Sequence, residues 1–363
     1  MTTYTLAASE ARHTLANGHN VADELMTGEL WDGQVQIRSL PNNFAGFLTT
    51  TLQVFVFNLA SRAYQGFPAT GKMVTLQTKV LLNNGQQMPA LGYGLWKTPP
   101  EQAREVVTEA LRLGYRHIDS AASYKNEAGA GEAIREATNI PRSDVHFTSK
   151  VRLITYDDCK AQVEKTLAET GFDYIDLMLL HCPYGTSEGR KGAWEALVEA
   201  QEAGKVKSIG VSNYGIHHLD QLEQHICELE VKRGGKGKGG KINVAQYELH
   251  PWCARREIVE WCKARDIVVE AYSPLVRGKR WGDARLVKLA DKYSKSEAQI
   301  LLRWSLQKGF VPLPKSVTPA RIRDNTDIYD FELSEADVTA LETDEYAPVC
   351  WDPTVSPFES SPQ

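Results

Sequence analysis

The sequence predicts an α/β protein: a (β/α)8 or TIM barrel, preceded by a β-hairpin and by an N-terminal extension. Between residues 91 and 325, short apolar segments alternate eight times with amphipathic segments. Such alternation is typical of a parallel sheet covered by helices, and eight units are the number that closes a barrel. A doubly wound sheet would need a glycine-rich turn after its first strand, whereas Gly92-Tyr93-Gly94 lies within a strand and lacks the third glycine.

Each element has its own signal. The hairpin is indicated by the period-2 alternation of Val74–Val80 and by the turn dipeptide Asn84-Gly85. Apolar runs predict strands at 91–95, 116–121, 145–151, 174–181, 206–211, 242–249, 267–272 and 310–313. Helical periodicity predicts helices at 101–113, 127–138, 157–170, 193–203, 216–230, 255–265, 284–293, 297–307 and 319–325.

Residues 1–72 differ from the rest, and Met73 opens a clean domain that we extend to residue 363. The first 37 residues are polar and contain too many acidic residues for a transit peptide. Residues 44–60 carry no charge, but their threonines and amides argue against a membrane helix. We expect a poorly ordered extension or one that lies over the domain; an over-long gene model is a further hypothesis, which mass spectrometry of the native N-terminus tests.

Composition narrows the function classes. The chain is 42% hydrophobic and 24% charged, with a net charge of -5, so it has no basic footprint for nucleic acid. Its six cysteines form no C-x-x-C pair, and no metal-binding spacing such as H-E-x-x-H occurs. These features favour a cytoplasmic protein with reduced thiols and no metal. We expect a monomer or a weak homodimer.

Two irregular segments remain. Gly235–Lys241 nearly matches a phosphate-binding P-loop, but it lacks the Ser/Thr after the lysine and precedes a strand, so we interpret residues 232–241 as a flexible basic surface loop. The tail from Tyr346 to Gln363 carries Trp351 and Phe358, and is a candidate for covering the mouth of the barrel.

The predicted strands end in polar or aromatic groups of different kinds. They are Trp96, Asp119, Lys150, His181, Ser212, Asn213, Gln246, Tyr272, Lys315 and Ser316. Each has a structural explanation by itself, such as a hydrogen-bonded core histidine or a helix cap. Barrel enzymes, however, build their sites at the carboxyl ends of the strands, and packing does not explain so varied a set on one face.

Met73–Asp352 resembles the aldo-keto reductase superfamily over nearly its whole length, and the likeness is to the short-loop microbial and fungal type that includes diketo-gluconate reductases. The matching segments, in family order, are Gly114–Ala121 with Tyr124, Leu177–His181, Gly210–Tyr214, Gln246–Pro251, Ala271–Leu275, and Pro314–Pro319 with Arg321 and Asn325. Residues 1–72 and the basic loop have no counterpart in the family.

The resemblance implies reduction of aldehydes or ketones by a nicotinamide cofactor. Tyr124 would donate the proton, and Lys150 would lower the pKa of its phenol. Asp119 would keep that lysine charged, and His181, as a neutral imidazole, would orient the carbonyl oxygen.

The resemblance also assigns the cofactor. Ser212, Asn213 and Gln246 would hold the nicotinamide carboxamide, with Tyr272 stacking on the ring. Ser273 and Leu275 would line the pyrophosphate path. The set Lys315, Ser316, Arg321 and Asn325 belongs to the cofactor-phosphate motif, and its cations suit the 2′-phosphate of NADPH.

Substrate binding is less defined. Trp96 would wall the pocket, and Cys182 stands where many relatives have a bulky Trp. A small aldehyde or α-dicarbonyl is the expected substrate. The alternative is a non-catalytic NADP-binding regulatory or structural member of the fold, which would use residues 1–72 or the basic loop to dock.

Overall fold

The structure is a computed structural model that describes residues 30–31, 34–35, 74–152 and 155–359. The chain divides into two compact units, 1–62 and 63–363. In the first, β2 (Leu30–Trp31) pairs antiparallel with β3 (Gln34–Val35). The rest of the predicted extension, including residues 44–60, lies outside the described residues. Within the described part, no helix is both long and apolar enough to cross a bilayer.

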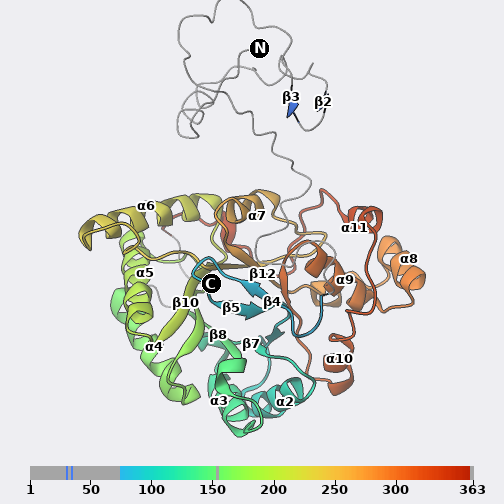
Figure 1. Cartoon of the computed structure of the whole chain (residues 1–363), viewed down its shortest axis with the longest axis horizontal. Helices are drawn as coiled ribbons and strands as arrows, with labels where there is room; N and C mark the ends of the chain where they lie inside the picture. The colour runs from blue at the N-terminus through green and yellow to red at the C-terminus, as the bar shows by residue number, and fades with distance from the viewer. Residues whose placement is uncertain (1–29, 32–33, 36–73, 153–154, 360–363) are drawn as a thin grey trace, which may run out of the picture. The chain divides into compact units, whose positions relative to one another are not determined.

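The second unit contains the predicted barrel, and the prediction is confirmed (Figure 1). Its parallel strands are β6 (Tyr93–Gly94), β7 (His117–Asp119), β8 (His146–Val151), β9 (Ile175–Leu180), β10 (Val206–Ser212), β11 (Val244–Glu248), β12 (Val268–Tyr272) and β13 (Val311–Leu313). Two backbone hydrogen bonds close the ring between its first and last strands, from Gly92 N to Pro312 O and from Gly94 N to Pro314 O, each 3.0 Å long.

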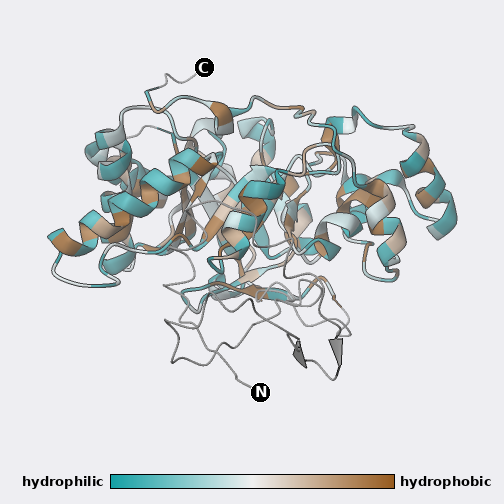
Figure 2. Cartoon of the chain, turned by 90° about the horizontal axis from the view of Figure 1, so that it is seen from above, coloured by the Kyte–Doolittle hydropathy of each residue, from teal (hydrophilic) through white to brown (hydrophobic). Residues whose placement is uncertain are grey.

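Helices surround the strands with apolar faces inward and hydrophilic faces outward (Figure 2). They are α2 (Pro100–Arg112), α3 (Glu127–Glu136), α4 (Tyr156–Thr170), α5 (Ser187–Glu202), α6 (Ile216–Lys232), α7 (Arg256–Lys263), α8 (Ala284–Tyr293), α9 (Glu297–Gln307), α10 (Pro319–Asp324) and α11 (Glu335–Leu341). The short helix η2 (Ala122–Tyr124) begins shortly after β7, following Ser120 and Ala121.

The hairpin joins β4 (Lys79–Leu81) to β5 (Gln87–Pro89), with Gly85 at a positive φ of 86° in the turn. Asn84 in that turn donates to Ser208 Oγ near the start of β10. The hairpin therefore covers the amino-terminal end of the barrel and leaves the carboxyl-terminal end open for a site. The predicted strand was too long, because Thr75 to Thr78 forms a hydrogen-bonded turn before β4 begins.

Two helices differ from the prediction. Helix α5 begins at Ser187 rather than 193, since Thr186 caps it by accepting from Gly189 N. Helix α11 was not predicted. Residues 233–241 form an exposed loop, as expected, but the loop is anchored where the indole of Trp194 donates to Gly239 O.

Candidate active site

A cavity of about 740 Å³ lies at the carboxyl ends of the strands. Its lining includes nearly every residue that the sequence analysis selected, from Trp96, Asp119, Tyr124 and His181 at one end to Ser316, Arg321 and Asn325 at the other. Lys150 lies directly behind this wall, on β8. Most of these side chains stand on, or just after, the last residues of parallel strands, whose carboxyl ends lie on one face of the barrel. Tyr124 comes from η2, and Arg321 from α10.

Lys150 and Asp119 form a buried ion pair. The ammonium Nζ lies 2.7 and 2.8 Å from the two carboxylate oxygens and 2.8 Å from Ser120 O. Burial alone would lower the pKa of Lys150, but the charge of Asp119, with help from Tyr124, raises it above the ordinary value. The lysine therefore stays protonated although its side chain is only 1% exposed.

Tyr124 lies beside this pair, with Lys150 Nζ 5.3 Å from the centre of its ring. Burial raises the pKa of the phenol to about 12, and the ammonium of Lys150 opposes that rise. The lysine thus acts in the direction expected from the sequence, but burial outweighs it here. The phenol is held in its protonated form, ready to donate.

His181 faces Tyr124 across the site, with ring centroids 5.8 Å apart. It follows β9 directly. Burial, and then the charges of Lys150 and Arg152, lower its pKa to about 3. The imidazole is therefore neutral near pH 7, and can donate an N–H to a carbonyl oxygen without carrying charge.

Polar groups on β10 to β12 form a connected layer beside these residues. Asn213 donates to His181 O and to Ser212 Oγ, each at 3.0 Å, and accepts from the Tyr272 hydroxyl at 2.8 Å. Ser212 donates to Gln246 O. Asn213 has a positive φ of 64°, a backbone conformation that asparagine tolerates well. The three amide and hydroxyl groups predicted to hold a carboxamide thus lie side by side.

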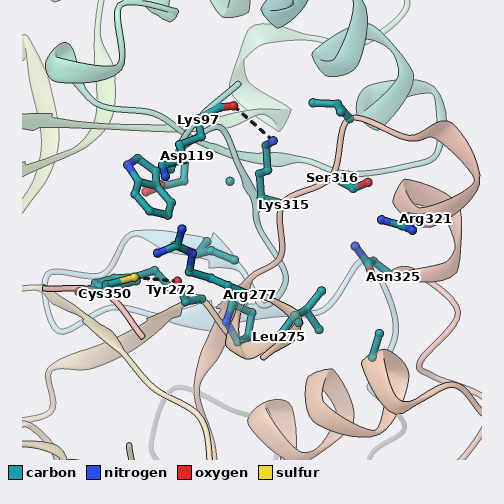
Figure 3. Close-up of a pocket in the computed structure, with 18 of the residues that line it drawn as sticks. Lys97, Asp119, Tyr272, Leu275, Arg277, Lys315, Ser316, Arg321, Asn325 and Cys350 are labelled. Atoms are coloured by element: carbon teal, nitrogen blue, oxygen red, sulfur yellow. Dashed lines mark hydrogen bonds between the residues drawn. The ribbon is translucent and has the colours of Figure 1, made fainter. Parts of the chain in front are cut away.

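The far end of the cavity carries the predicted phosphate residues (Figure 3). Ser316 is buried, and its carbonyl accepts from Tyr93 Oη at 2.5 Å. Arg321 and Asn325 come from α10 and the residue that follows it. Lys315 points into the cavity, and its pKa is lowered by burial and by the nearby Lys97.

Two further cations line the middle of the cavity. Lys97 Nζ and the Arg277 guanidinium lie 4.7 and 5.0 Å from the centre of the Trp96 ring. Arg277 also donates to Val349 O. Sequence reasoning missed both. Lys97 directly follows the selected Trp96 but belongs to no motif, and Arg277 lies beyond the end of β12 and the motif that follows it.

The C-terminal tail reaches the cavity, as predicted. Glu248 at the end of β11 accepts from the backbone N–H groups of Val349 and Cys350. This anchor places the Trp351 ring 6.4 Å from that of His181, while its indole donates to Tyr184 Oη at 3.0 Å.

The two predicted substrate residues lie apart. Trp96 lines the cavity. Cys182 is buried beside Tyr184, and burial raises the pKa of its thiol to about 11. An indole does stand in the cavity wall beside His181, but it belongs to Trp351 in the C-terminal tail and not to position 182.

Glu270 is a third residue that sequence reasoning missed. It is fully buried in the barrel interior on β12 and lies within 2.8 Å of Gln246 Nε2. An acid inside the apolar run Val268–Tyr272 was the available signal.

Comparison with known proteins gives a consistent result. Residues 88–343 match the model of the aldo/keto reductase family. An uncharacterized oxidoreductase of Schizosaccharomyces pombe is 42% identical over 77% of this chain and 98% of its own length. The glyoxal reductase of Bacillus subtilis is 40% identical over 75% and 95%. The methylglyoxal reductase of Escherichia coli is 37% identical over 71% and 90%. The crystal structure of an aldo/keto reductase from Brucella melitensis aligns with a TM-score of 0.66 at 39% identity, covering 73% of this chain and 98% of that one.

Proposed function

This chain belongs to the aldo/keto reductase family and is an oxidoreductase, and on that premise we propose that it reduces small aldehydes and α-dicarbonyls with NADPH, with Tyr124 as proton donor. The observation that carries the proposal is the buried arrangement of Tyr124, Lys150, Asp119 and His181 at the cavity wall.

The chain's own residues account for the proton. The Tyr124 hydroxyl gives its proton to the carbonyl oxygen, and the phenolate that remains lies beside the Lys150 ammonium. Asp119 keeps that ammonium charged, as its two short contacts indicate. His181 donates an N–H to the same carbonyl oxygen and fixes its direction. A positioned proton donor of this kind contributes about 10²–10⁴ in rate.

A reduced nicotinamide dinucleotide, when bound, supplies the hydride. The residues fit such a group: the cavity is about 740 Å³ and runs from the catalytic end to Arg321 and Asn325. Gln246 uses its N–H donors on two carboxyl groups, so its carbonyl oxygen remains for a carboxamide. Lys315, Ser316 and Arg321 support the 2′-phosphate and hence NADPH over NADH, by about ten- to hundredfold.

The relatives named glyoxal reductase and methylglyoxal reductase support a small dicarbonyl substrate. The position of Trp351 beside His181 supports it too, since an indole there leaves less room for a large group. The cysteines are all free, which fits the proposed cytoplasmic location.

The test is loss of NADPH absorbance with glyoxal, methylglyoxal and a panel of larger aldehydes, run on the full chain. We expect turnover of the small dicarbonyls, and much weaker turnover with NADH. NADPH binding without turnover of any carbonyl would contradict the proposal, as would equal efficiency with NADH.

A further inference from the structure

A second buried carboxyl group lies beneath the proposed catalytic residues. Glu270 on β12 stands in register with Gln246 on β11. One amide nitrogen, Gln246 Nε2, donates to Glu270 Oε2 and to Asp119 Oδ2, each at 2.8 Å. A single side chain thus connects Glu270 to the carboxylate that pairs with Lys150.

The surroundings of Glu270 determine its charge. Strand β7 contributes Asp119 and also His117, whose Nε2 lies 3.3 Å from Glu270 Oε1. Strand β8 contributes Lys150, and β13 places the apolar Val311 in register with Glu270. Burial first, and then the neighbouring His146, lower the pKa of His117 to about 3. The ammonium of Lys150 is therefore the cation of this group, and Asp119 already binds it through both oxygens.

One ammonium does not neutralise two buried carboxylates. Burial, and then the charge of Asp119, raise the pKa of Glu270 to about 8. Near neutrality Glu270 therefore carries a proton, and His117 Nε2, 3.3 Å from Oε1, accepts it in the tautomer that carries its hydrogen on Nδ1. The ion pair of the site is then Lys150–Asp119, and Glu270 is a neutral acid connected to it through the amide of Gln246.

We propose that Glu270 is a positioning residue of this reductase: protonated, it fixes the Gln246 amide, and its ionisation slows carbonyl reduction at alkaline pH. This rests on the proposed function. When Glu270 ionises, a second negative charge joins the group, and the Tyr124 phenolate left by proton donation is less well stabilised. The phenol becomes a poorer acid, so reduction slows.

Glu270 also acts through the direction of the Gln246 amide. With its nitrogen held by two carboxyl groups, the carbonyl oxygen is left for the cavity. Without Glu270, one of these contacts disappears and the amide is free to rotate. A loss of binding energy at the carboxamide end of the cofactor follows.

Glu270→Gln tests the ionisation, because it keeps the shape and an accepting oxygen but does not titrate. We expect kcat/KM near the wild-type value at neutral pH and an alkaline limb that moves up by about one pH unit or more. The matched control is Glu127→Gln, another buried carboxyl with a raised pKa, which lies on α3 and contacts Ser149. Its alkaline limb should stay where the wild type has it. An unchanged limb in Glu270→Gln would overturn the proposal.

Glu270→Leu tests the amide. We expect about tenfold weaker NADPH binding, measured by quenching of tryptophan fluorescence, with normal binding restored in Glu270→Gln. A merely structural role would weaken folding in both variants without this rescue. Equal affinity in all three proteins would exclude the positioning role.

Thermal unfolding without cofactor separates this inference from the proposed function. Since the pKa of Glu270 is raised in the fold, its stabilising protonation is complete below the ordinary carboxyl pKa and is lost as pH rises through about 8. The Tm of the wild type should therefore fall more steeply from acid to alkaline pH than that of Glu270→Gln. Parallel curves would refute the ionisation. A difference would support it even if no carbonyl substrate were found, in which case the reductase proposal alone would fail.

Discussion

The charge on Lys150 determines what Tyr124 can do. The phenol is buried, and burial raises its pKa to about 12, so a neighbouring cation is needed to stabilise the phenolate at all. That cation survives in the barrel interior only because Asp119 accompanies it at 2.7 Å. The proposed acid, its cation and the carboxylate thus act as one unit, and single substitutions should be far from additive.

Tyr124→Phe removes the proposed proton donor and little else. We expect turnover to fall by about 10²–10⁴, because proton transfer loses its positioned acid, while NADPH affinity changes little. Single-turnover kinetics and a binding titration measure the two effects. Near-normal reduction by this variant would remove Tyr124 from the mechanism.

Lys150→Met leaves Asp119 buried without its cation. We expect a loss of about 3 kcal/mol in the free energy of unfolding, measured by urea denaturation. The double variant Lys150→Met with Asp119→Leu should regain part of that stability, since no charge is left unpaired, yet stay inactive. If the double variant is less stable than the single one, the ion pair is not the reason for the loss.

The low pKa of His181 makes a separate prediction. A pKa of about 3 leaves the ring neutral from mildly acid to neutral solution, so its titration should cause no fall in kcat/KM between about pH 5 and 7. A pH–rate profile with an acid limb near 6.5 that disappears in His181→Gln would show a charged imidazole instead.

At the scale of elements, the carboxyl ends of the strands and the C-terminal tail contribute different parts of the cavity. The strand ends supply Asp119, Lys150 and His181, η2 supplies the proposed proton donor Tyr124, and the tail between Tyr346 and Phe358 supplies one wall of the cavity. The tail is fixed by buried charges: Glu248 binds its backbone, and Arg255 donates to Asp352 Oδ1 at 3.0 Å and to Thr354 Oγ1 at 2.7 Å. A rigid wall can discriminate between substrates by size.

Trp351→Ala removes that wall. We expect about a tenfold rise in KM for methylglyoxal, with improved use of larger aldehydes, because the small substrate loses a contact surface. Val355→Ala is the control on the same tail, since its side chain is 73% exposed. Equal KM values in both variants would mean that Trp351 does not contact substrate.

The segment that follows β13 carries the proposed choice of cofactor. Arg321→Ala removes one of the cations proposed for the 2′-phosphate, so NADPH affinity should fall about tenfold while NADH affinity stays the same. The ratio of the two dissociation constants measures this effect. Arg323→Ala on the same helix, which does not line the cavity, should leave the ratio unchanged.

At the scale of the whole molecule, the barrel is the part with a known architecture. The family match spans residues 88–343, and the hairpin that covers the barrel starts at Lys79. We propose that residues 73–363 form the catalytic domain and residues 1–72 an extension to it. A chain of residues 73–363 should therefore keep the Tm and the kcat/KM of the full chain. A large loss of either would show that the extension contributes to the fold or the site.

The order of strands and helices could be predicted from the sequence, because apolar strands and amphipathic helices alternate with clear periods. The misjudged start of α5 has a local cause: Gly189 and Gly192 in its first two turns resemble a loop, and the capping hydroxyl of Thr186 gives only a weak signal. Strand Val74–Val80 was overestimated because alternation alone does not distinguish a strand from a turn.

The sequence by itself determined the barrel, its family, and the strand-end side chains, because each depends on period, order and motif. Only the tertiary structure showed which side chains contact one another and so shift one another's pKa values. The amide of Gln246 contacts both Asp119 and Glu270, Arg277 lies beside the Trp96 ring, and Trp351 lies beside His181. Each of these contacts joins segments far apart in the chain. The pKa values and contacts of these residues depend on burial and on distances between side chains, and both are properties of the folded chain that no local segment of sequence specifies.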